Sequence, residues 1–418
     1  MSGPSAVARR TPISNSMQGM QQWPSPQQPT ASTRIDVLIP VWNGAATVAS
    51  AIDSIRTQTF GNIRIIIVDD GSSDATPRIL AGMAACDPRI VVITIPHGGI
   101  VDALNAGLAQ CTAEVIARHD ADDIAYPHRL AEQLAYLDAN PDCVAVASFA
   151  RVVDENGYPT GGLATSIPDS FDPTWIPCKE PYLLHPFLMV RRRELMAIGG
   201  YRYVCHAEDA DLCWRLQELG RLHAIPRPLG DYRIHAASVT GLSTLNGRLS
   251  SIYSQLAAIS ALRRRSHATD LPFPKSAIDL MHAAVTPDGM FAIAKRELNA
   301  TETAYLKAAF AAKYMELASY RSYEIELGDI QFIRAALSSV EPHLPQANRK
   351  SLRRSRAVLG ARLLSKGRWR AALALMSLET LVETAVRFGV HVVSRCLPPR
   401  VRIAIWDYRS RNIISRLQ

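Results

Sequence analysis

Short β-branched runs alternate with helical periods between residues 34 and 148, and this alternation limits the fold more than any other feature. Between the runs, apolar residues recur three or four positions apart, as at Val48, Ile52 and Ile55. This repeated order predicts an α/β fold with a mostly parallel sheet flanked by helices. The expected strands are Ile35–Ile39, Ile63–Val68, Ile90–Ile95, Glu114–Arg118 and Cys143–Ser148.

The rest of the chain divides by composition. The first 33 residues contain no acid and are rich in Ser, Pro, Gln and Thr, which is typical of disorder. Residues 155–182 lose periodicity and gain Pro and Gly, which predicts a long loop. Beyond Thr244 only helical periods remain. We therefore expect a disordered segment at 1–33, an α/β domain at 34–244 and an α-helical C-terminal region at 245–418.

Polar, turn-forming residues follow three of the expected strands. Asn43 follows the first strand, Asp70 the second, and Asp120, Asp122 and Asp123 the fourth. Each of them alone is explained by a helix cap, a turn or an acidic loop. Ligands of parallel sheets collect where the carboxyl ends of the strands meet, and carboxylate oxygens suit hard divalent cations. Together these strand ends predict a crevice for a nucleotide diphosphate and a cation.

Cysteine usage and hydropathy bear on the cellular compartment. The seven cysteines form no C-x-x-C pair and no metal-ligand spacing, which indicates reduced core thiols of a cytosolic protein. No window approaches the roughly 20 apolar residues that span a bilayer, and the N-terminus has no apolar signal core. We therefore expect a cytoplasmic protein that is neither secreted nor integral to a membrane.

The net charge of +8 is unevenly distributed. Residues 341–418 contain 16 Lys and Arg against 4 acids, and at the end of the chain these cations interleave with apolar residues. Such a segment suits anionic lipid headgroups, nucleic acid or plain solvation. We expect peripheral contact with an anionic membrane surface at its inner face, and we expect no nucleic-acid partner.

An ordered series of motifs between about Arg34 and Thr240 resembles family 2 glycosyltransferases of the GT-A fold. The series covers half of the chain and is more specific than any one motif. It consists of Val37–Asn43, Ile65–Asp74, Gly99–Leu108, Asp120–Asp123 with Pro127–Leu130, His185–Met189, Gly199–Arg202, Ala207–Leu212 and Tyr232–His235.

The resemblance implies an inverting, metal-dependent transfer of a sugar from a nucleotide diphosphate sugar, expected to be a UDP-sugar. Mg²⁺ or Mn²⁺ would be the cofactor. The resemblance assigns Pro40, Val41 and Asn43 to the nucleoside pocket, and Asp70 to the uracil N–H.

The resemblance also assigns the acidic motif at the end of the fourth strand. Asp120 would face the ribose and the metal, Asp122 would bind the metal directly, and Asp123 would support them.

The acids that open the helix at Glu208 supply the candidate base. Asp and Glu in a first helical turn ordinarily complement the helix dipole, an effect worth about 0.3 to 1 kcal/mol. The resemblance instead favours Asp209 as the general base and Glu208 as a residue that orients the acceptor. Arg233 would share the phosphate charge, and His235 would be a third metal ligand or merely a polar residue.

His185 lies near the start of a segment expected to return to the sheet, and its role could be structural.

The chain departs from processive relatives because it lacks a Gln-x-x-Arg-Trp motif and membrane-spanning segments. We therefore expect addition of a single sugar to a glycan or lipid-linked acceptor in cell-surface polysaccharide synthesis.

Two functions other than glycosyl transfer would also use a nucleotide-binding sheet of this kind. A nucleotidyltransferase would require a basic, Gly-rich phosphate loop, but Pro40–Gly44 contains no Lys or Arg. A non-catalytic binding module would be favoured if the carboxylates were missing, but Asp70, Asp120, Asp122 and Asp209 are all present.

Overall fold

The computed structural model describes residues 33–166, 170–234, 243–321 and 324–376, together with Thr380, Thr384, Ala385 and Arg387. The predicted disordered segment, apart from its last residue, lies outside these ranges. His235 and the basic end of the chain from residue 388 onward also lie outside them.

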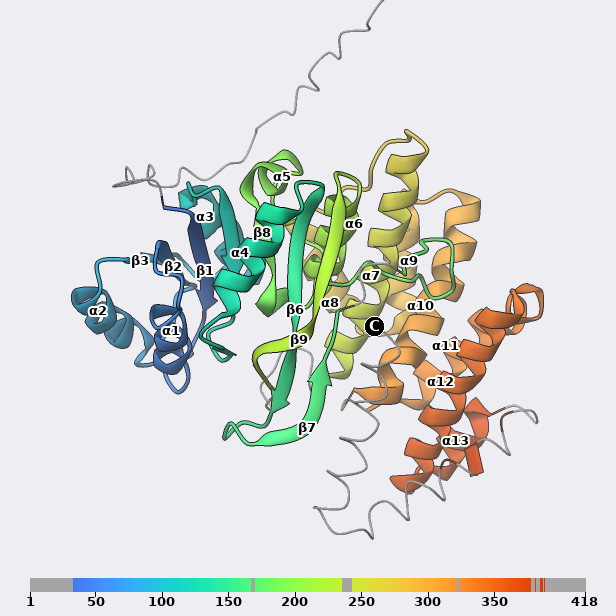
Figure 1. Cartoon of the computed structure of the whole chain (residues 1–418). Coiled ribbons are helices and arrows are strands. Elements are labelled where there is room, and N and C mark those ends of the chain that lie inside the picture. Colours follow the sequence, from blue (N-terminus) through green and yellow to red (C-terminus); the bar gives the residue numbers. More distant parts are fainter. Residues whose placement is uncertain are drawn as a thin grey trace, which may run out of the picture.

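A nine-stranded sheet runs through the N-terminal half in the order β3-β2-β1-β4-β8-β6-β9-β5, with β7 paired to β6 (Figure 1). Strand β1 is parallel to β2 and β4, β2 to β3, and β6 to β9, whereas β8 is antiparallel to both β4 and β6. The prediction of a mostly parallel sheet is confirmed. The strands are β1 (Ile35–Val41), β2 (Ile63–Asp69), β3 (Ile90–Thr94), β4 (Val115–Arg118), β5 (Ile124–Ala125), β6 (Cys143–Val153), β7 (Pro159–Ala164), β8 (Met189–Arg191) and β9 (Arg221–Arg233).

Helices cover both faces of this sheet. In β1, Ile35, Val37 and Ile39 pack in one core, while Leu38 packs in the core on the other face. Burial on both faces explains why the strands are continuous apolar runs. The helices of this half are α1 (Val48–Arg56), α2 (Thr76–Cys86), α3 (Ile100–Gln110), α4 (Arg129–Ala139), α5 (Arg192–Ala197) and α6 (Glu208–Gln217).

Part of the predicted loop at 155–182 is a strand, which corrects the sequence-based expectation. Strand β7 forms an antiparallel ladder with β6 from Ala164 to Pro159, with a register shift near its end. None of its residues is fully buried, and Gly161 and Gly162 interrupt it. An exposed, glycine-containing edge strand lacks the apolar alternation from which strands are predicted.

The C-terminal half is helical, as predicted, and lies on the side of β6 and β9 (Figure 1). Among the described residues, no helix is both long enough and apolar enough to cross a bilayer. The helices are α7 (Thr244–Arg265), α8 (Lys275–Ala284), α9 (Pro287–Ala294), α10 (Ala300–Tyr320), α11 (Leu327–Ser338), α12 (Gln346–Ser365) and α13 (Trp369–Leu375).

One shared core joins the two halves. Trp214 of α6 and Val204 before it are buried in the same cluster as Leu249 of α7 and Phe310 of α10. Burial of large side chains supplies about 1.5 to 3 kcal/mol each, so this cluster holds α6 firmly against α7. The helical half therefore supports the helix that carries the predicted base.

Candidate active site

The loops after β1 and β2 are joined by hydrogen bonds through Asn43. The backbone N–H of Asn43 donates to Ser72 Oγ at 2.8 Å, and the backbone N–H of Ser73 donates to the side-chain Oδ1 of Asn43 at 2.8 Å. Asn43 has a positive φ of 50°, a conformation that asparagine tolerates better than most residues. The predicted nucleoside-pocket residues Pro40 and Val41 are buried, and they are the last two residues of β1, shortly before Asn43.

Asp70 fixes the start of α3 to the end of β2. Its side chain is buried, and its Oδ1 and Oδ2 accept the Gly98 and Gly99 amides at 2.8 and 2.9 Å. The Nδ1 atom of His97 lies 2.9 Å from Oδ2. The His97 ring stacks on Trp42 with centroids 4.6 Å apart, and Trp42 is 55% exposed. The sequence analysis did not predict this aromatic pair, although Trp42 lies inside the motif Val37–Asn43.

Three carboxylates converge after β4. Oxygen atoms of Asp120, Asp122 and Asp123 lie within 4.8 Å of one another. Burial, reinforced by the other two acids, raises the pKa of Asp123 well above its ordinary value. Oδ2 of Asp123 is buried and has no hydrogen-bond partner among the described residues. A hard divalent cation would satisfy this oxygen-only, negatively charged cluster, so the residues fit Mg²⁺ or Mn²⁺.

Arg118 lies beneath this cluster and was not anticipated. It is the last residue of β4, it is 5% exposed, and its Nη2 lies 2.5 Å from Asp120 Oδ1. Its Nε and Nη1 atoms are buried and have no partner within the described part of the chain. A cation at the end of an otherwise apolar strand was the available signal. A buried guanidinium with donors to spare can hold an anionic group in place.

Arg233 clamps the acidic loop from the end of β9. Its amide donates to Asp123 Oδ1 at 2.8 Å, and its Nε donates to the Asp122 carbonyl at 2.8 Å. Its Nη1 donates to the Glu155 carbonyl at 2.8 Å. These contacts hold Arg233 against the backbone and one carboxylate of the acidic cluster.

Glu208 and Asp209 lie in the first turn of α6, and both are half-buried. Burial, with a contribution from Asp209, raises the pKa of Glu208 to about 8. Burial likewise raises the pKa of Asp209. Asp120 also contributes to the raised pKa of Glu208, and Arg118 opposes the shift in both acids. The acidic cluster and the first turn of α6 therefore interact electrostatically around Arg118, as parts of one site.

His185 and Tyr201 are also close enough to Arg118 to interact with its charge. His185 is buried, and its Nε2 lies 2.9 Å from the Tyr201 hydroxyl. Burial, together with Arg118, lowers the pKa of His185 well below its ordinary value, so the ring is neutral. Asn105 hydrogen-bonds the backbone of Tyr201 in both directions. The sequence left the role of His185 open, and the structure pairs it with Tyr201.

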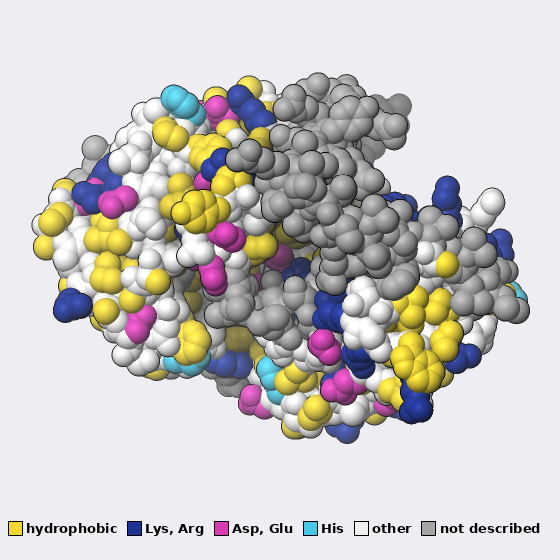
Figure 2. Space-filling view, turned by 90° about the horizontal axis from the view of Figure 1, so that it is seen from below, with side chains coloured by type: hydrophobic (Ala, Val, Ile, Leu, Met, Phe, Trp, Pro, Cys, Tyr) yellow, Lys and Arg dark blue, Asp and Glu magenta, His cyan; other side chains and the backbone are white. Residues whose placement is uncertain are grey.

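A cavity of about 1170 Å³ lies beside Asp209. The helical half supplies part of its wall, which sequence reasoning did not foresee. Figure 2 shows acidic side chains near the centre of this end of the molecule, with Lys and Arg side chains on the helical half beside them. The lining includes Trp175, Lys179, Tyr182, Asp209, Tyr232, Lys313 and Arg321.

Known proteins share these motifs. Residues 36–199 match the family model described as Glycosyl transferase family 2. The chain is 30% identical over 215 residues to the O-antigen biosynthesis glycosyltransferase WbnJ of Escherichia coli, covering 49% of this chain and 81% of that protein. It is 29% identical over 188 residues to the amylovoran biosynthesis glycosyltransferase AmsE of Erwinia amylovora, covering 44% and 70%.

Among solved structures, the chain aligns with the mannosyltransferase PcManGT from Pyrobaculum calidifontis in complex with GDP-Man and Mn²⁺. The identity is 17%, the TM-score is 0.45, and 88% of this chain and 90% of that chain are covered.

Proposed function

The chain belongs to glycosyl transferase family 2, and from that premise we propose that it transfers one sugar, with inversion, from a UDP-sugar to a hydroxyl of a glycan or lipid-linked acceptor. The observation that carries the proposal is the position of Arg118, whose guanidinium pairs with Asp120 and whose charge also acts on Asp209, the candidate base. Arg118 therefore links the candidate cation site to the candidate base. The chain is a glycosyltransferase, so the nucleotidyltransferase and binding-module alternatives are set aside.

The acidic cluster is the proposed donor end of the site. Asp122 and Asp120 would hold Mg²⁺ or Mn²⁺, with Asp123 supporting them and His235 as a further candidate ligand. The cation would act as a Lewis acid that stabilises the negative charge of the departing nucleoside diphosphate. Arg118 keeps Asp120 in place through their ion pair, and Arg233 holds the loop through the Asp122 carbonyl.

The loops after β1 and β2 are the proposed nucleoside end. Pro40, Val41 and Asn43 would line the pocket, and Asp70 would accept the uracil N–H. Each oxygen of Asp70 already accepts one backbone N–H, and Oδ2 also lies 2.9 Å from His97 Nδ1, so the second lone pair of Oδ1 would accept the uracil N–H. The exposed Trp42 beside this loop offers a flat apolar surface on which a base or ribose can pack.

Asp209 is the proposed general base. Its Oδ1 accepts the Ala210 amide at 2.8 Å, which leaves Oδ2 for the proton of the acceptor hydroxyl. A raised pKa makes a carboxylate a stronger base, and general-base catalysis typically contributes about 100- to 10,000-fold. Glu208, with a pKa of about 8, is protonated at neutral pH and can donate a hydrogen bond to the acceptor.

The cavity beside Asp209 is the proposed acceptor site. Its volume of about 1170 Å³ has room for sugar units. Trp175 lies on its wall with Lys179 Nζ 3.7 Å from the ring centroid, an aromatic face of the kind on which sugars pack. The names of WbnJ and AmsE support a surface polysaccharide as the product class.

Diphosphate release tests the activity. The full-length protein would be incubated with Mn²⁺ and a panel of nucleotide sugars while free nucleoside diphosphate is measured. We expect release from one UDP-sugar, loss of release in Asp209→Asn, and loss of release in Asp122→Asn at a Mn²⁺ concentration that just saturates the wild type. Asp279→Asn, a change at an exposed acid on α8, is the control that should retain activity. Release that is equal in all variants would refute the proposed site.

The basic end of the chain supports a peripheral location at the inner membrane face. Partition with anionic vesicles would be compared between the intact protein and one that lacks residues 390–418. Equal partition would rule out this segment as the anchor, and loss of partition is expected.

A further inference from the structure

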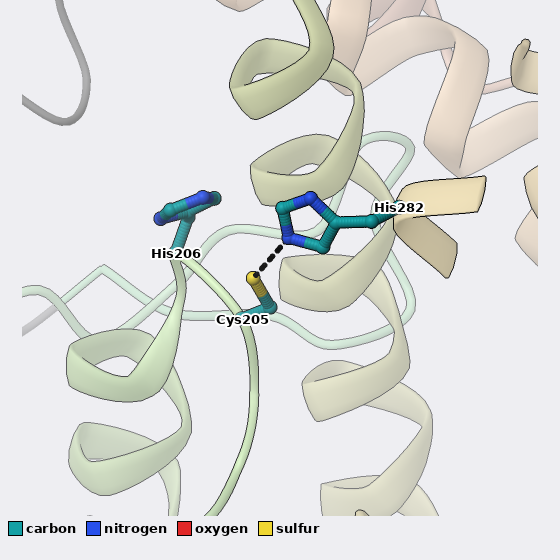
Figure 3. A group of neighbouring side chains, drawn as sticks. All are labelled: Cys205, His206 and His282. Atoms are coloured by element: carbon teal, nitrogen blue, oxygen red, sulfur yellow. Dashed lines mark hydrogen bonds between the residues drawn. The ribbon is translucent and has the colours of Figure 1, made fainter. Parts of the chain in front are cut away.

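Three side chains that commonly bind soft metal ions converge near the start of α6, away from the acidic cluster. Donor atoms of Cys205, His206 and His282 lie within 4.8 Å of one another. The Cys205 sulfur lies between the two imidazole rings (Figure 3). Cys205 and His206 precede α6, whereas His282 belongs to α8 of the helical half.

The separation of the donor atoms suits one tetrahedral ion. Sγ of Cys205 lies 3.9 Å from Nε2 of His282. In a tetrahedral zinc site with Zn–S of about 2.3 Å and Zn–N of about 2.0 Å, these two atoms are about 3.5 Å apart. Small side-chain rotations therefore bring the pair to coordination distance.

The backbone conformation of His206 and a hydrogen bond of its ring orient this side chain for metal binding. Its φ of 57° lies in the left-handed region that residues other than glycine rarely adopt, and its ring centroid lies 6.5 Å from that of His282 on α8. The ring also hydrogen-bonds the Asn246 side chain, the kind of outer contact that orients ligating histidines.

We propose that Cys205, His206 and His282 bind one Zn²⁺ ion, with water as the fourth ligand. A thiolate and two imidazoles favour zinc over Mg²⁺ or Mn²⁺, which prefer oxygen ligands. The Cys205 thiol loses its proton to solvent when the sulfur binds the metal. His206 also lines the cavity beside Asp209, so water can reach the fourth position.

The bound ion would fasten α8 to the segment that leads into the catalytic turn. The first residue of α8, Lys275, already forms an ion pair with Asp102 of α3, and the Tyr203 hydroxyl donates to the same carboxylate at 2.5 Å. Zinc would secure the other end of α8, at His282, to His206, which lies two residues before Glu208 in the chain. The site therefore acts by positioning and stabilising, and it takes no part in sugar transfer.

Metal titration of the full-length protein tests this site independently of transferase activity. Chelator-treated protein would be titrated with Zn²⁺ or Co²⁺ in excess Mg²⁺, which occupies oxygen sites. We expect one equivalent of Zn²⁺ to bind, a sulfur-to-metal charge-transfer absorption with Co²⁺, and a rise in Tm on adding Zn²⁺. Asp122→Asn should behave like the wild type, because its carboxylate is not part of the site.

Variants separate this site from adventitious binding. Cys205→Ser should abolish the charge-transfer absorption, and His282→Ala should weaken Zn²⁺ binding at least tenfold and remove the rise in Tm. Cys86→Ser and His343→Ala change an exposed thiol and an exposed imidazole, so both should bind like the wild type. If Cys205→Ser does not fold, His282→Ala decides alone. Zinc binding that is absent, or unchanged in His282→Ala, would overturn the proposal.

Discussion

The Nη2 atom of Arg118 lies 2.5 Å from Oδ1 of Asp120, in a site where Arg118 is almost fully buried. A buried cation against a carboxylate neutralises part of the charge of the acidic cluster before any ligand binds. The contact from Nη2 also limits the orientations open to the Asp120 carboxylate. The ion pair therefore links the end of β4 to the donor end of the proposed site.

Replacing Arg118 should impair turnover through Asp120. We expect Arg118→Gln to lower kcat/KM by about 10- to 100-fold, the usual effect of removing a residue that orients a metal ligand. Arg118→Lys keeps the positive charge but lacks the planar guanidinium group, so it should recover only part of the lost kcat/KM. Steady-state kinetics with varied Mn²⁺ would measure both, and a wild-type apparent Mn²⁺ affinity in Arg118→Gln would contradict this role.

Asp209 and Asp211 share the first turn of α6 but should respond differently to the same substitution. Asp209→Asn removes the proposed base, so kcat should fall about 100- to 10,000-fold while the protein remains folded. Asp211 is fully buried and forms ion pairs with Arg202 and Arg215. Asp211→Asn leaves buried charge uncompensated and should destabilise the fold by about 3 to 5 kcal/mol.

Denaturant unfolding and kcat, measured on both variants, would separate these roles. A folded Asp211→Asn with wild-type stability, or an Asp209→Asn with wild-type kcat, would reverse the assignment.

The sheet was predictable from sequence because its information is local. Strand β1 is buried on both faces, so its apolar run stands out from the helices beside it. Strand β7 escaped prediction because it is an exposed edge strand that contains glycines and pairs with β6. Edge pairing of this kind depends on a partner strand, which composition alone does not reveal.

The site was predictable where its residues follow strands of one parallel sheet. Asp120, Asp122 and Asp123 follow one strand, so their convergence could be anticipated. The burial of Arg118 and the pairing of His185 with Tyr201 arise from tertiary packing. Lys313 of α10 lies far along the chain from Glu180, with which it forms an ion pair at 3.3 Å on the cavity wall, and its helical period resembles that of any packed helix.

Metal removal should stop turnover, and its reversal should depend on Asp122. We expect a chelator to abolish nucleoside diphosphate release and Mn²⁺ or Mg²⁺ to restore it, because the acidic cluster offers only oxygen ligands. Asp122→Asn should need at least about tenfold more Mn²⁺ for half-maximal rate, since an amide oxygen is a weaker ligand than a carboxylate. Metal-dependence curves for the two proteins would measure the difference. Full activity of the chelated wild type would contradict the assignment.

Glu208 should make the stability of the protein fall as pH rises. Its pKa is about 8 in the folded protein because of burial and Asp209, against about 4.5 in an unfolded chain. Between these pH values the folded state keeps a proton that the unfolded state releases, so the contribution of Glu208 to stability is fully present below pH 4.5 and is lost as pH rises toward 8. Glu208→Gln is neutral at every pH and should not lose this contribution.

Urea unfolding from pH 5 to pH 8.5 would therefore show Glu208→Gln gaining on the wild type with rising pH. The gain should reach about 1 kcal/mol or more, since a tenfold change in proton affinity corresponds to about 1.4 kcal/mol. Asp209→Asn removes a neighbouring acid that raises the pKa of Glu208, so it should reduce the pH dependence without abolishing it. Parallel curves for the wild type and Glu208→Gln would mean that Glu208 ionises freely and cannot hold a proton toward the acceptor at neutral pH.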